Sequence, residues 1–302
     1  MFGLVKIMQQ WPDDNLHLIV CDVGQGDAIL LTHGFWQILI DAGPDEHVLD
    51  CLYDNIPFWD KKIEQVVVTH MDYDHIGGME AVLDAFLIKN LWLSDKKTSK
   101  TAQNLFKDLD DEQLMGMRVQ TPFLGSLVSS NSQLVLTVLW PQSIGEFSKK
   151  AIFLQNSDGK NEKTETKLSD EVQQQILATE DHNARSIVLY LEYGKFNALL
   201  TGDAPITTEL ALTDQHLIQP LNALKVGHHG AKTSTSTQIL KDSKPELSLI
   251  SCGLDNQYDH PDVEVVSNLE EWSGRLLRTD LQGSIELVTD GQKYWLFVNE
   301  EI

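Results

Sequence analysis

The sequence contains few cysteines, and their arrangement indicates neither a disulfide framework nor a CxxC zinc site. Its 302 residues include only Cys21, Cys51 and Cys252, an odd number without paired spacing. The first residues lack the charged start, long apolar stretch and small-residue cleavage site of a signal peptide. These features favour a cytoplasmic protein with reduced thiols. The alternative is a soluble domain associated with a membrane protein.

Long apolar runs and basic residues are also scarce. The longest apolar runs, such as AFLIKNLWL at 85–93, fall well short of the roughly 20 residues of a membrane span, so we expect no membrane segment in this chain. Lys and Arg total 23 against 45 Asp and Glu, which gives a net charge of −22. Proteins that bind nucleic acid over a large surface use Lys and Arg to neutralise phosphates, so the excess of acidic residues argues against binding of that kind. It does not exclude a local groove lined by cationic residues or metal ions.

Apolar strands alternate with helical segments, which predicts a layered α/β fold. Two or three strands are expected in 16–44, with a hairpin turn near HGFW, followed by a helix at 45–54. A strand at 66–70 leads through a loop into a helix at 78–87. Further on, we expect a strand at NLWLSD, a polar helix around 101–110 and strands near 117–139.

The composition changes between residues 142 and 182, where a polar, charged stretch is interpreted as a surface insertion with a short helix at DEVQQQILA. After it, YGKFNALLTGDAP (193–205) repeats the plan of HGFWQILIDAGP (33–44): a glycine turn, an apolar strand, then Asp beside Gly. A third hairpin is predicted at 283–298. The two similar halves suggest a pseudo-symmetric fold with its site where the halves meet.

The stretch VVVTHMDYDHIGGM (66–79) places four ligand-type side chains directly after an apolar strand. His70, Asp72, Asp74 and His75 fall within six residues. Without a cation, the carboxylates would repel each other and raise one another's pKa. Imidazole and carboxylate together are ordinary ligands of zinc, manganese or iron, so this cluster predicts a metal site. Gly77 and Gly78 are interpreted as a tight turn into the next helix.

Three later segments contain further candidates. Asp203 stands at a strand end in LLTGDAP, although alone it would be taken for a turn residue. The adjacent His228 and His229 lie between glycines in LKVGHHGAKTSTS, which is uncommon for structural histidines. His260 precedes a proline at an expected helix start, where a surface histidine is the plain alternative.

These residues resemble a known family. HMDYDHIGG is similar to the HxHxDHxGG signature of the metallo-β-lactamase superfamily, with Asp72 in place of the middle histidine. Five stretches in order resemble the soluble domain of the ComEC competence proteins: CDVGQGDAILL with LIDAG, HMDYDHIGG, ARSIVLYLEYGKFNALLTGDA, LKVGHHGAKTSTS, and GLDNQYDHP with LLRTDLQGSI. ComEC proteins carry long membrane-spanning regions, and this chain departs from them there.

The resemblance implies an αββα four-layer sandwich, formed by residues 1–302 as one domain with the insertion at 142–182. It also implies two divalent metal ions at one edge of the two sheets, zinc or, because Asp72 makes the first site richer in oxygen, manganese. The implied ligands of the first metal are His70 and Asp72, those of the second are Asp74 and His75, and Asp203 bridges both. His228, or alternatively His229, completes the second metal. The region EDHNARS offers His182 or Asn183 for the first.

Roles beyond ligation follow from the same resemblance. Asp74 would orient the attacking water, and Lys232 and His260 would stabilise the charge that develops on a phosphorane. His260 would also protonate the leaving oxygen. Lys225 is a weaker candidate because it lies inside an apolar strand. The implied border of the site is the loop of Asp22, Gly24, Gln25, Gly26 and Asp27, with Asp41 bracing metal ligands.

The leading function is therefore a metal-dependent phosphodiesterase, a nuclease acting on single-stranded DNA in DNA uptake, with a membrane channel as partner. The alternative enzymatic hypothesis is a hydrolase with the same metal site whose substrate is a small phosphodiester, thioester or lactone. A hypothesis from another class of protein is a binding module with a degenerate metal site. Lactam hydrolysis ranks low because Asp72 replaces the second histidine.

Overall fold

The computed structural model describes residues 11–94, 116–130, 133–141, 152–155, 161–164 and 181–298. The chain divides into two compact units: unit 1 is Met1–Thr121, Ser251–Asn256 and Arg278–Ile302, and unit 2 is Pro122–Ile250 and Gln257–Leu277. The expected helices near 101–110 and 170–178, and most of the expected insertion, lie outside the described residues. Within that insertion the structure describes an antiparallel hairpin of β9 (Ile152–Gln155) and β10 (Asn161–Thr164). The single-domain organisation stays a prediction.

Unit 1 contains an eight-stranded sheet with the strand order β17-β16-β1-β2-β3-β4-β5-β6. Its strands are β17 (Tyr294–Val298), β16 (Ile285–Thr289), β1 (Leu16–Val20), β2 (Ile29–His33), β3 (Trp36–Ile40), β4 (Lys62–Val68), β5 (Leu87–Leu93) and β6 (Arg118–Gln120). Pairing is antiparallel from β17 to β3 and parallel from β3 to β6. The expected hairpins at 33–44 and 283–298 are thus confirmed.

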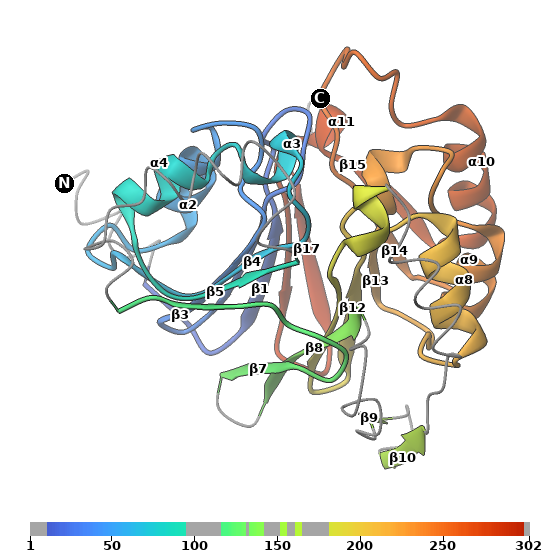
Figure 1. Ribbon diagram of the computed structural model, residues 1–302, viewed down its shortest axis with the longest axis horizontal. Helices are drawn as coiled ribbons and strands as arrows, with labels where there is room; N and C mark the ends of the chain where they lie inside the picture. Colours follow the sequence, from blue (N-terminus) through green and yellow to red (C-terminus); the bar gives the residue numbers. More distant parts are fainter. Residues whose placement is uncertain are drawn as a thin grey trace. The chain divides into compact units, whose positions relative to one another are not determined.

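The centre of this sheet is apolar because it is covered on both faces. In β4, Ile63 and the three valines 66–68 are fully buried, which explains the unbroken apolar run before the motif. The helices α2 (Val48–Asn55) and α4 (Met79–Ala85) lie on one face of the sheet (Figure 1), and α3 (Tyr73–Ile76) is a single turn between β4 and α4. The helices expected at 45–54 and 78–87 are confirmed. Unit 1 also includes α11 (Thr279–Gln282).

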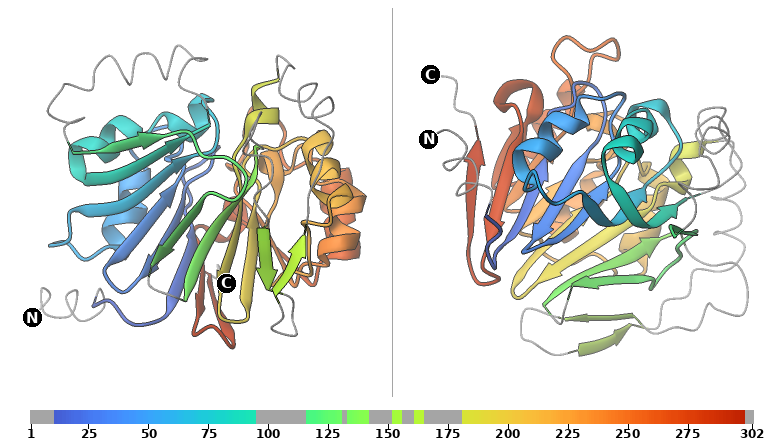
Figure 2. Two further views of the ribbon diagram at one scale, coloured as in Figure 1. Left: turned by 60° about the horizontal axis from the view of Figure 1, so that its bottom comes forward. Right: turned by 90° about the vertical axis from the view of Figure 1, so that its left-hand side faces the viewer.

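Unit 2 contains a seven-stranded sheet with the order β15-β14-β13-β12-β11-β8-β7. Its strands are β15 (Arg275–Arg278), β14 (Leu247–Ile250), β13 (Ala223–Lys225), β12 (Phe196–Leu200), β11 (Val188–Tyr193), β8 (Leu134–Trp140) and β7 (Leu127–Ser130). One face carries α8 (Ile206–Asp214), α9 (Thr237–Ser243) and α10 (Val263–Trp272), as Figures 1 and 2 show. Side-chain caps begin two of them: Ser236 accepts from the Ile239 amide and Asp262 from the Glu264 amide.

The repeat noted in the sequence corresponds to equivalent local structure in each unit. Strands β2 and β3 pair as an antiparallel hairpin in unit 1, as β11 and β12 do in unit 2. Each turn contains a glycine in the left-handed region, Gly34 with φ 60° and Gly194 with φ 61°. Asp41 follows β3 directly and Asp203 follows β12 after two residues, so the shared sequence plan places an aspartate beyond the same strand of each hairpin.

Among the described residues, no helix combines the length and apolar character needed to cross a membrane.

A disulfide joins Cys21 and Cys51, so the prediction from the cysteine count was wrong. Cys21 follows β1 and Cys51 lies in α2, and their Cα atoms are 5.8 Å apart across 30 residues of sequence. The bond forms because α2 packs on the face of the sheet to which Cys21 points, a tertiary contact that spacing does not reveal. Cys252 is buried and free. With two of its three cysteines in a disulfide, the chain does not have the fully reduced thiols expected of a protein in a reducing compartment.

Replacing Cys21 and Cys51 together by Ala is expected to lower the free energy of unfolding by about 3 kcal/mol, because a closed loop of this length restricts the unfolded chain. Urea unfolding, followed by circular dichroism with and without reductant, measures the change. The reductant should shift the wild-type midpoint and leave the double variant unchanged, and Cys252→Ala serves as the cysteine control. A wild-type midpoint insensitive to a reductant that demonstrably frees both thiols would contradict the stabilising role.

Candidate metal site

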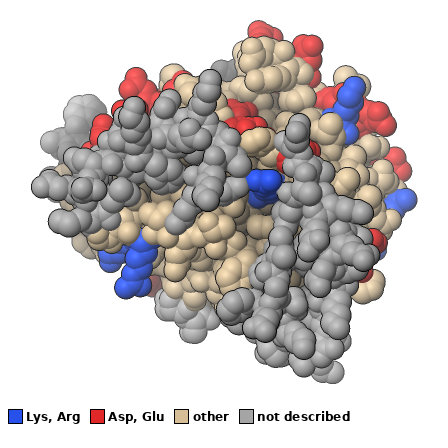
Figure 3. Space-filling model, in the orientation of Figure 1, with Lys and Arg blue, Asp and Glu red and all other residues tan. Residues whose placement is uncertain are grey.

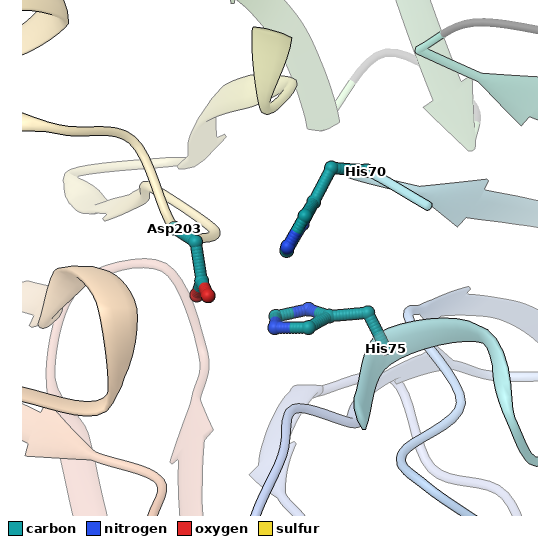
Figure 4. Close-up of side chains that lie close together, drawn as sticks. All are labelled: His70, His75 and Asp203. Carbon is teal, nitrogen blue, oxygen red and sulfur yellow. The ribbon is translucent and has the colours of Figure 1, made fainter. Parts of the chain in front are cut away.

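Two histidines of the HMDYDHIGG stretch lie together in unit 1. His70 follows the end of β4, and His75 lies in α3, so a strand and a helical turn present one ring each (Figure 4). The ring centroids are 4.1 Å apart, and both side chains are almost fully buried. The Nδ1 atom of His70 lies 3.1 Å from the Thr69 hydroxyl.

Asp41 organises this pair from the end of the neighbouring strand. Its carboxylate accepts hydrogen bonds from the Thr69 amide (2.7 Å), the Thr69 hydroxyl (2.7 Å) and Nδ1 of His75 (2.8 Å). Because Nδ1 of His75 donates to Asp41, the Nε2 atom of that ring carries the lone pair that a metal requires. Burial raises the pKa of Asp41, although the His75 and Thr69 contacts oppose the rise. These contacts with Thr69 and His75 support the role expected for Asp41, which is to hold the proposed metal ligands in place.

Asp27 lies closer to the histidines than the sequence indicated. It is buried, and Asp27, Asp41 and His75 each offer a ligand atom within 4.8 Å of the others. The sequence placed Asp27 only at the border of the site, because nothing in the DVGQGD stretch shows which side chain turns inward. Its backbone amide donates to the Asp74 carbonyl (3.1 Å), which ties its loop to the motif loop.

Glycines permit this close approach of loops. A Cβ atom at Gly26 would overlap the Asp74 carbonyl, and one at Gly77 or Gly78 would overlap carbonyl oxygens of residues 42–45. Gly77 and Gly78 have ordinary helical φ angles of −60° and −79°. They form the expected turn between α3 and α4, and glycine is required there because another backbone segment passes beside them.

The two remaining motif carboxylates are less buried. Asp72 stands at the N-cap position of α3, and its Oδ2 atom lies 3.7 Å from Nε2 of His70. Asp74 is half-buried, and its carbonyl receives the Asp27 amide. Unit 1 thus groups His70, Asp72 and His75, with Asp74 on the same short turn.

Unit 2 groups an aspartate with the paired histidines. Asp203, drawn in Figure 4 on the loop after β12, has its Oδ2 atom 3.7 Å from Nε2 of His228 and 3.6 Å from Nε2 of His229. Both histidines lie in a 3-10 turn, Gly227–Gly230, with left-handed φ angles of 48° and 55°. His229 is buried and His228 is partly exposed. Because both present Nε2 to one carboxylate, the choice between them as ligand stays open.

Of the two residues proposed to complete the first metal, Asn183 is the one beside His228. Its Nδ2 atom lies 3.4 Å from Nδ1 of His228, whereas His182 is exposed in the turn His182–Arg185. The Thr233 hydroxyl also lies 3.2 Å from Nδ1 of His228.

Two lysines near the paired histidines differ in exposure. Lys225 is fully buried at the end of β13, and its Nζ atom donates to the Val226 carbonyl (2.9 Å). Lys232, which follows the GHHG turn, is exposed. The lower rank given to Lys225 as a substrate contact agrees with this burial.

His260 lies beside the paired histidines, with its ring centroid 5.8 Å from that of His228. Burial, and then the neighbouring His228 and His229, hold the pKa of His260 below its usual value. Tyr258 stacks on His260 at 5.8 Å with an interplanar angle of 20°, and Tyr258 is 54% exposed. No local sequence pattern marks Tyr258, because its exposure and its stacking on His260 are tertiary properties of this loop.

The donor atoms of each unit suit a divalent metal ion. Buried imidazole nitrogens and carboxylate oxygens form the ligand set that zinc, manganese and iron bind in proteins. In unit 1, hydrogen bonds to Asp41 and Thr69 fix the two rings, as expected for metal ligands. In unit 2, one carboxylate lies between two imidazoles.

Comparison with known proteins identifies the family. Residues 21–253 match the metallo-beta-lactamase superfamily, a span of more than half the chain. The chain belongs to the metallo-β-lactamase superfamily. The fold prediction is therefore confirmed, with an α/β layer pair in each unit. A solved structure with the same fold is the metallo-beta-lactamase fold protein YhfI from Bacillus subtilis, with TM-score 0.53 and 11% identity, over 94% of this chain and 100% of that one.

Among curated proteins, the chain is similar to ComE operon protein 3 of Bacillus subtilis, at 27% identity over 88% of this chain and 32% of that protein. It is also similar to Recombination protein 2 of Haemophilus influenzae, at 24% identity over 92% of this chain and 29% of that protein. The chain thus spans about a third of the length of these relatives. The resemblance to competence proteins noted in the sequence is confirmed.

The charged side chains visible on one face bear on the substrate. On the face drawn in Figure 3, the described Lys and Arg side chains are few and separate, and acidic side chains lie among them. The described part of this face has no continuous basic strip of the kind that grips a long phosphate backbone.

Proposed function

We propose that this metallo-β-lactamase superfamily chain uses His70, Asp72, Asp74 and His75 of unit 1 together with Asp203 and His228 or His229 of unit 2 to bind two divalent cations, zinc or manganese. Membership of a superfamily of generally metal-dependent hydrolases supports the proposal. So does the grouping of buried imidazoles and carboxylates within each unit.

The proposed chemistry is hydrolysis of a phosphodiester. When bound, two divalent cations lower the pKa of a water and neutralise charge on the reacting phosphate. In this proposal Asp74 orients the attacking water. Exposed Lys232, together with His260 beside His228, offers positive charge to the phosphorane, and His260 protonates the leaving oxygen.

We propose single-stranded DNA as the substrate, with a nuclease role in DNA uptake and a membrane channel as partner. The observation that carries this is similarity over about nine-tenths of the chain to ComE operon protein 3 and Recombination protein 2, together with the shorter match to Competence protein ComA of Neisseria gonorrhoeae, at 35% identity over 35% of this chain and 16% of that protein. Tyr258 adds a physical argument, because an exposed ring stacked on a histidine can stack on a base.

Tyr258→Ala is expected to raise KM for single-stranded DNA by about tenfold, because stacking of one base on an aromatic ring contributes about 1–3 kcal/mol. Turnover at saturating DNA should change little, since the metal ligands are untouched. Steady-state cleavage of a fluorescein-labelled oligonucleotide with Mn²⁺ or Zn²⁺ gives both constants.

Two controls sharpen this test. Tyr258→Phe keeps the ring and should retain the wild-type KM, and Leu254→Ala removes another exposed side chain from the same segment of sequence. Hydrolysis of methyl p-nitrophenyl phosphate should not respond specifically to loss of the Tyr258 ring. An unchanged KM for DNA in Tyr258→Ala would argue against base stacking.

A small phosphodiester is the second candidate substrate, favoured by the scarcity of described Lys and Arg side chains in Figure 3. Thioesters and lactones belong to the same alternative. Metal-loaded protein that hydrolyses small esters and leaves DNA intact would select it. Metal-loaded, folded protein that hydrolyses neither would favour the binding module.

The Cys21–Cys51 disulfide bears on where the chain works. Disulfides persist in oxidising compartments and are rare in the cytosol. We propose that this domain works in an oxidising compartment. To test this proposal, cells are denatured directly in an alkylating reagent, so that free thiols are blocked before they can oxidise in the lysate. A domain with the Cys21–Cys51 disulfide would be alkylated at Cys252 alone, whereas a domain from a reducing cytoplasm would be alkylated at all three cysteines.

A further inference from the structure

Unit 1 contains a cavity of about 580 Å³ that none of the proposed metal ligands lines. Its size is within the range of small-molecule sites. Residues of β1, β2, β3, β16 and β17 line it, together with residues 11–15 before β1 and residues 54–57 at the end of α2. The cavity therefore lies on the face of the sheet that α2 covers in part.

The strand register explains which side chains form its floor. Directly paired residues share a face of a sheet, and the pairs Gln37–Thr32, Thr32–His17, His17–Val288 and Val288–Trp295 run across five strands. A second row pairs Ile19 with Glu286 and Glu286 with Phe297. All of these residues line the cavity, so its floor is a continuous part of one sheet face.

The lining is acidic. Asp13, Asp54 and Glu286 line the cavity, and its described lining includes no Lys or Arg. His17 lies between two of these carboxylates, with Nδ1 2.7 Å from Glu286 and Nε2 3.1 Å from Asp13. A protonated His17 offsets one of the three negative charges, and two remain.

Gln37 supplies a buried acceptor. Its side chain is about 1% exposed, and its Nε2 atom donates to Asp60 (3.2 Å). Among the described residues, its Oε1 atom has no hydrogen-bond partner. A buried carbonyl oxygen without a donor is costly, and here the side chain that carries it lines a cavity. A ligand with an N–H group would satisfy it.

Aromatic rings complete the surroundings. Trp11, Trp295 and Phe297 line the cavity and are 64%, 46% and 54% exposed. The faces of such rings attract ammonium and guanidinium groups, most strongly for Trp. The lining thus combines aromatic rings, carboxylates and the Gln37 oxygen acceptor. Together these groups favour a ligand that is positively charged and donates hydrogen bonds.

We propose that this cavity binds an organic cation with N–H donors, a primary ammonium or a guanidinium group on a carbon chain. The same chemistry is presented by a free amine and by a Lys or Arg side chain of a partner protein. The proposal is independent of the metal site. A neutral sugar would also stack on the rings, but it would leave the excess of carboxylates uncompensated.

The cation is expected to bind more tightly as the pH rises from 5.5 to 8. Burial opposes protonation of His17, but its hydrogen bonds to Glu286 and Asp13 dominate and hold its pKa above the usual value. Below that pKa, His17 carries a charge that competes with the ligand for Glu286 and Asp13. Above that pKa, His17 is neutral, and the Glu286 and Asp13 carboxylates can pair with the ligand cation. The titrating group that this prediction invokes is therefore His17.

Isothermal titration calorimetry with agmatine, spermidine and N-acetyl-arginine amide tests the proposal, the last as a mimic of a protein side chain. Tetraethylammonium lacks N–H donors and glucose lacks charge. Glu286→Gln should weaken agmatine binding by about tenfold, because a charge-assisted hydrogen bond is lost. Gln37→Leu and Trp295→Ala should each weaken it by about fivefold. The matched controls, Glu270→Gln and Phe35→Ala, change an exposed carboxylate and an exposed ring that do not line the cavity.

Tight binding of the arginine amide with weak binding of the free amines would indicate a protein partner, and the reverse a small molecule. Equal binding of glucose, equal binding of tetraethylammonium, or Glu286→Gln and Trp295→Ala variants that fold and bind agmatine like wild type would overturn the proposal. Asp203→Asn should bind the cation normally, which separates failure here from failure of the hydrolase.

Discussion

Asp203→Asn is expected to reduce metal-dependent cleavage of single-stranded DNA by at least about a hundredfold, because in the proposed site Asp203 would contribute its carboxylate to both metal ions. Asn has nearly the same shape, so the buried position after β12 is not emptied. The removed charge is the one that faces His228 and His229 at 3.7 and 3.6 Å. Cleavage of end-labelled oligonucleotides with Mn²⁺ or Zn²⁺ measures the effect, and Asp74→Ala, run alongside, should lose activity by a similar factor.

The matched control is Asp214→Asn, an exposed aspartate at the end of α8 in the same unit. It should cleave DNA at the wild-type rate. If Asp203→Asn and Asp74→Ala retain full activity while folded, the metal site is wrongly assigned. If wild type, loaded with metal, leaves DNA intact but hydrolyses methyl p-nitrophenyl phosphate, the site stands and the substrate is a small phosphodiester.

Asp41→Asn is expected to weaken metal binding by about 10–100-fold, the usual effect of removing a partner that orients a ligating histidine. The Asp41 carboxylate accepts from the Thr69 amide, the Thr69 hydroxyl and the His75 ring, and an amide cannot accept at both of its atoms. Asp41 has φ 60°, a conformation that Asn tolerates well, so the backbone is unaffected. Competition with a chromophoric chelator measures the affinity.

A second variant, Asp41→Ala, tests the contribution of Asp41 to the stability of the fold, apart from its effect on the orientation of the His75 ring. It leaves up to three donors without an acceptor and places Ala in the left-handed region, so we expect a loss of about 3 kcal/mol or more in unfolding free energy. Glu46→Gln, exposed on the following loop, should change neither stability nor metal affinity. Wild-type metal affinity in a folded Asp41→Asn variant would show that the hydrogen bond to His75 does not orient a ligand.

Local patterns in the sequence predicted the strands that lead into the motifs because the ends of those strands are buried and apolar, as with the three valines 66–68 of β4. The grouping of His70, Asp72, Asp74 and His75 needed no tertiary information, since one short turn holds all four. The disulfide could not be predicted in this way, because it depends on where α2 packs against β1. The same holds for Asp27, whose burial results from the contact between two loops.

The choice between His228 and His229 shows a second limit. In a regular strand or helix, adjacent side chains point in different directions, and one of two neighbouring histidines would be excluded. Here both residues adopt left-handed backbone angles, and both rings reach Asp203. Sequence periodicity has no means of anticipating such a turn.

The loops of unit 1 are joined to one another mainly through their backbones. The Asp27 amide donates to the Asp74 carbonyl, the Ala42 amide to the His75 carbonyl, and the Gly78 amide to the Gly43 carbonyl. These bonds do not depend on side-chain identity; they depend on glycine where the segments touch. The scaffold can therefore accept an aspartate at position 72, where the superfamily signature has a histidine, without a change in loop shape. Single substitutions at the proposed ligands can therefore change the donor atoms without changing the backbone, whereas the glycines between them leave almost no room for a side chain.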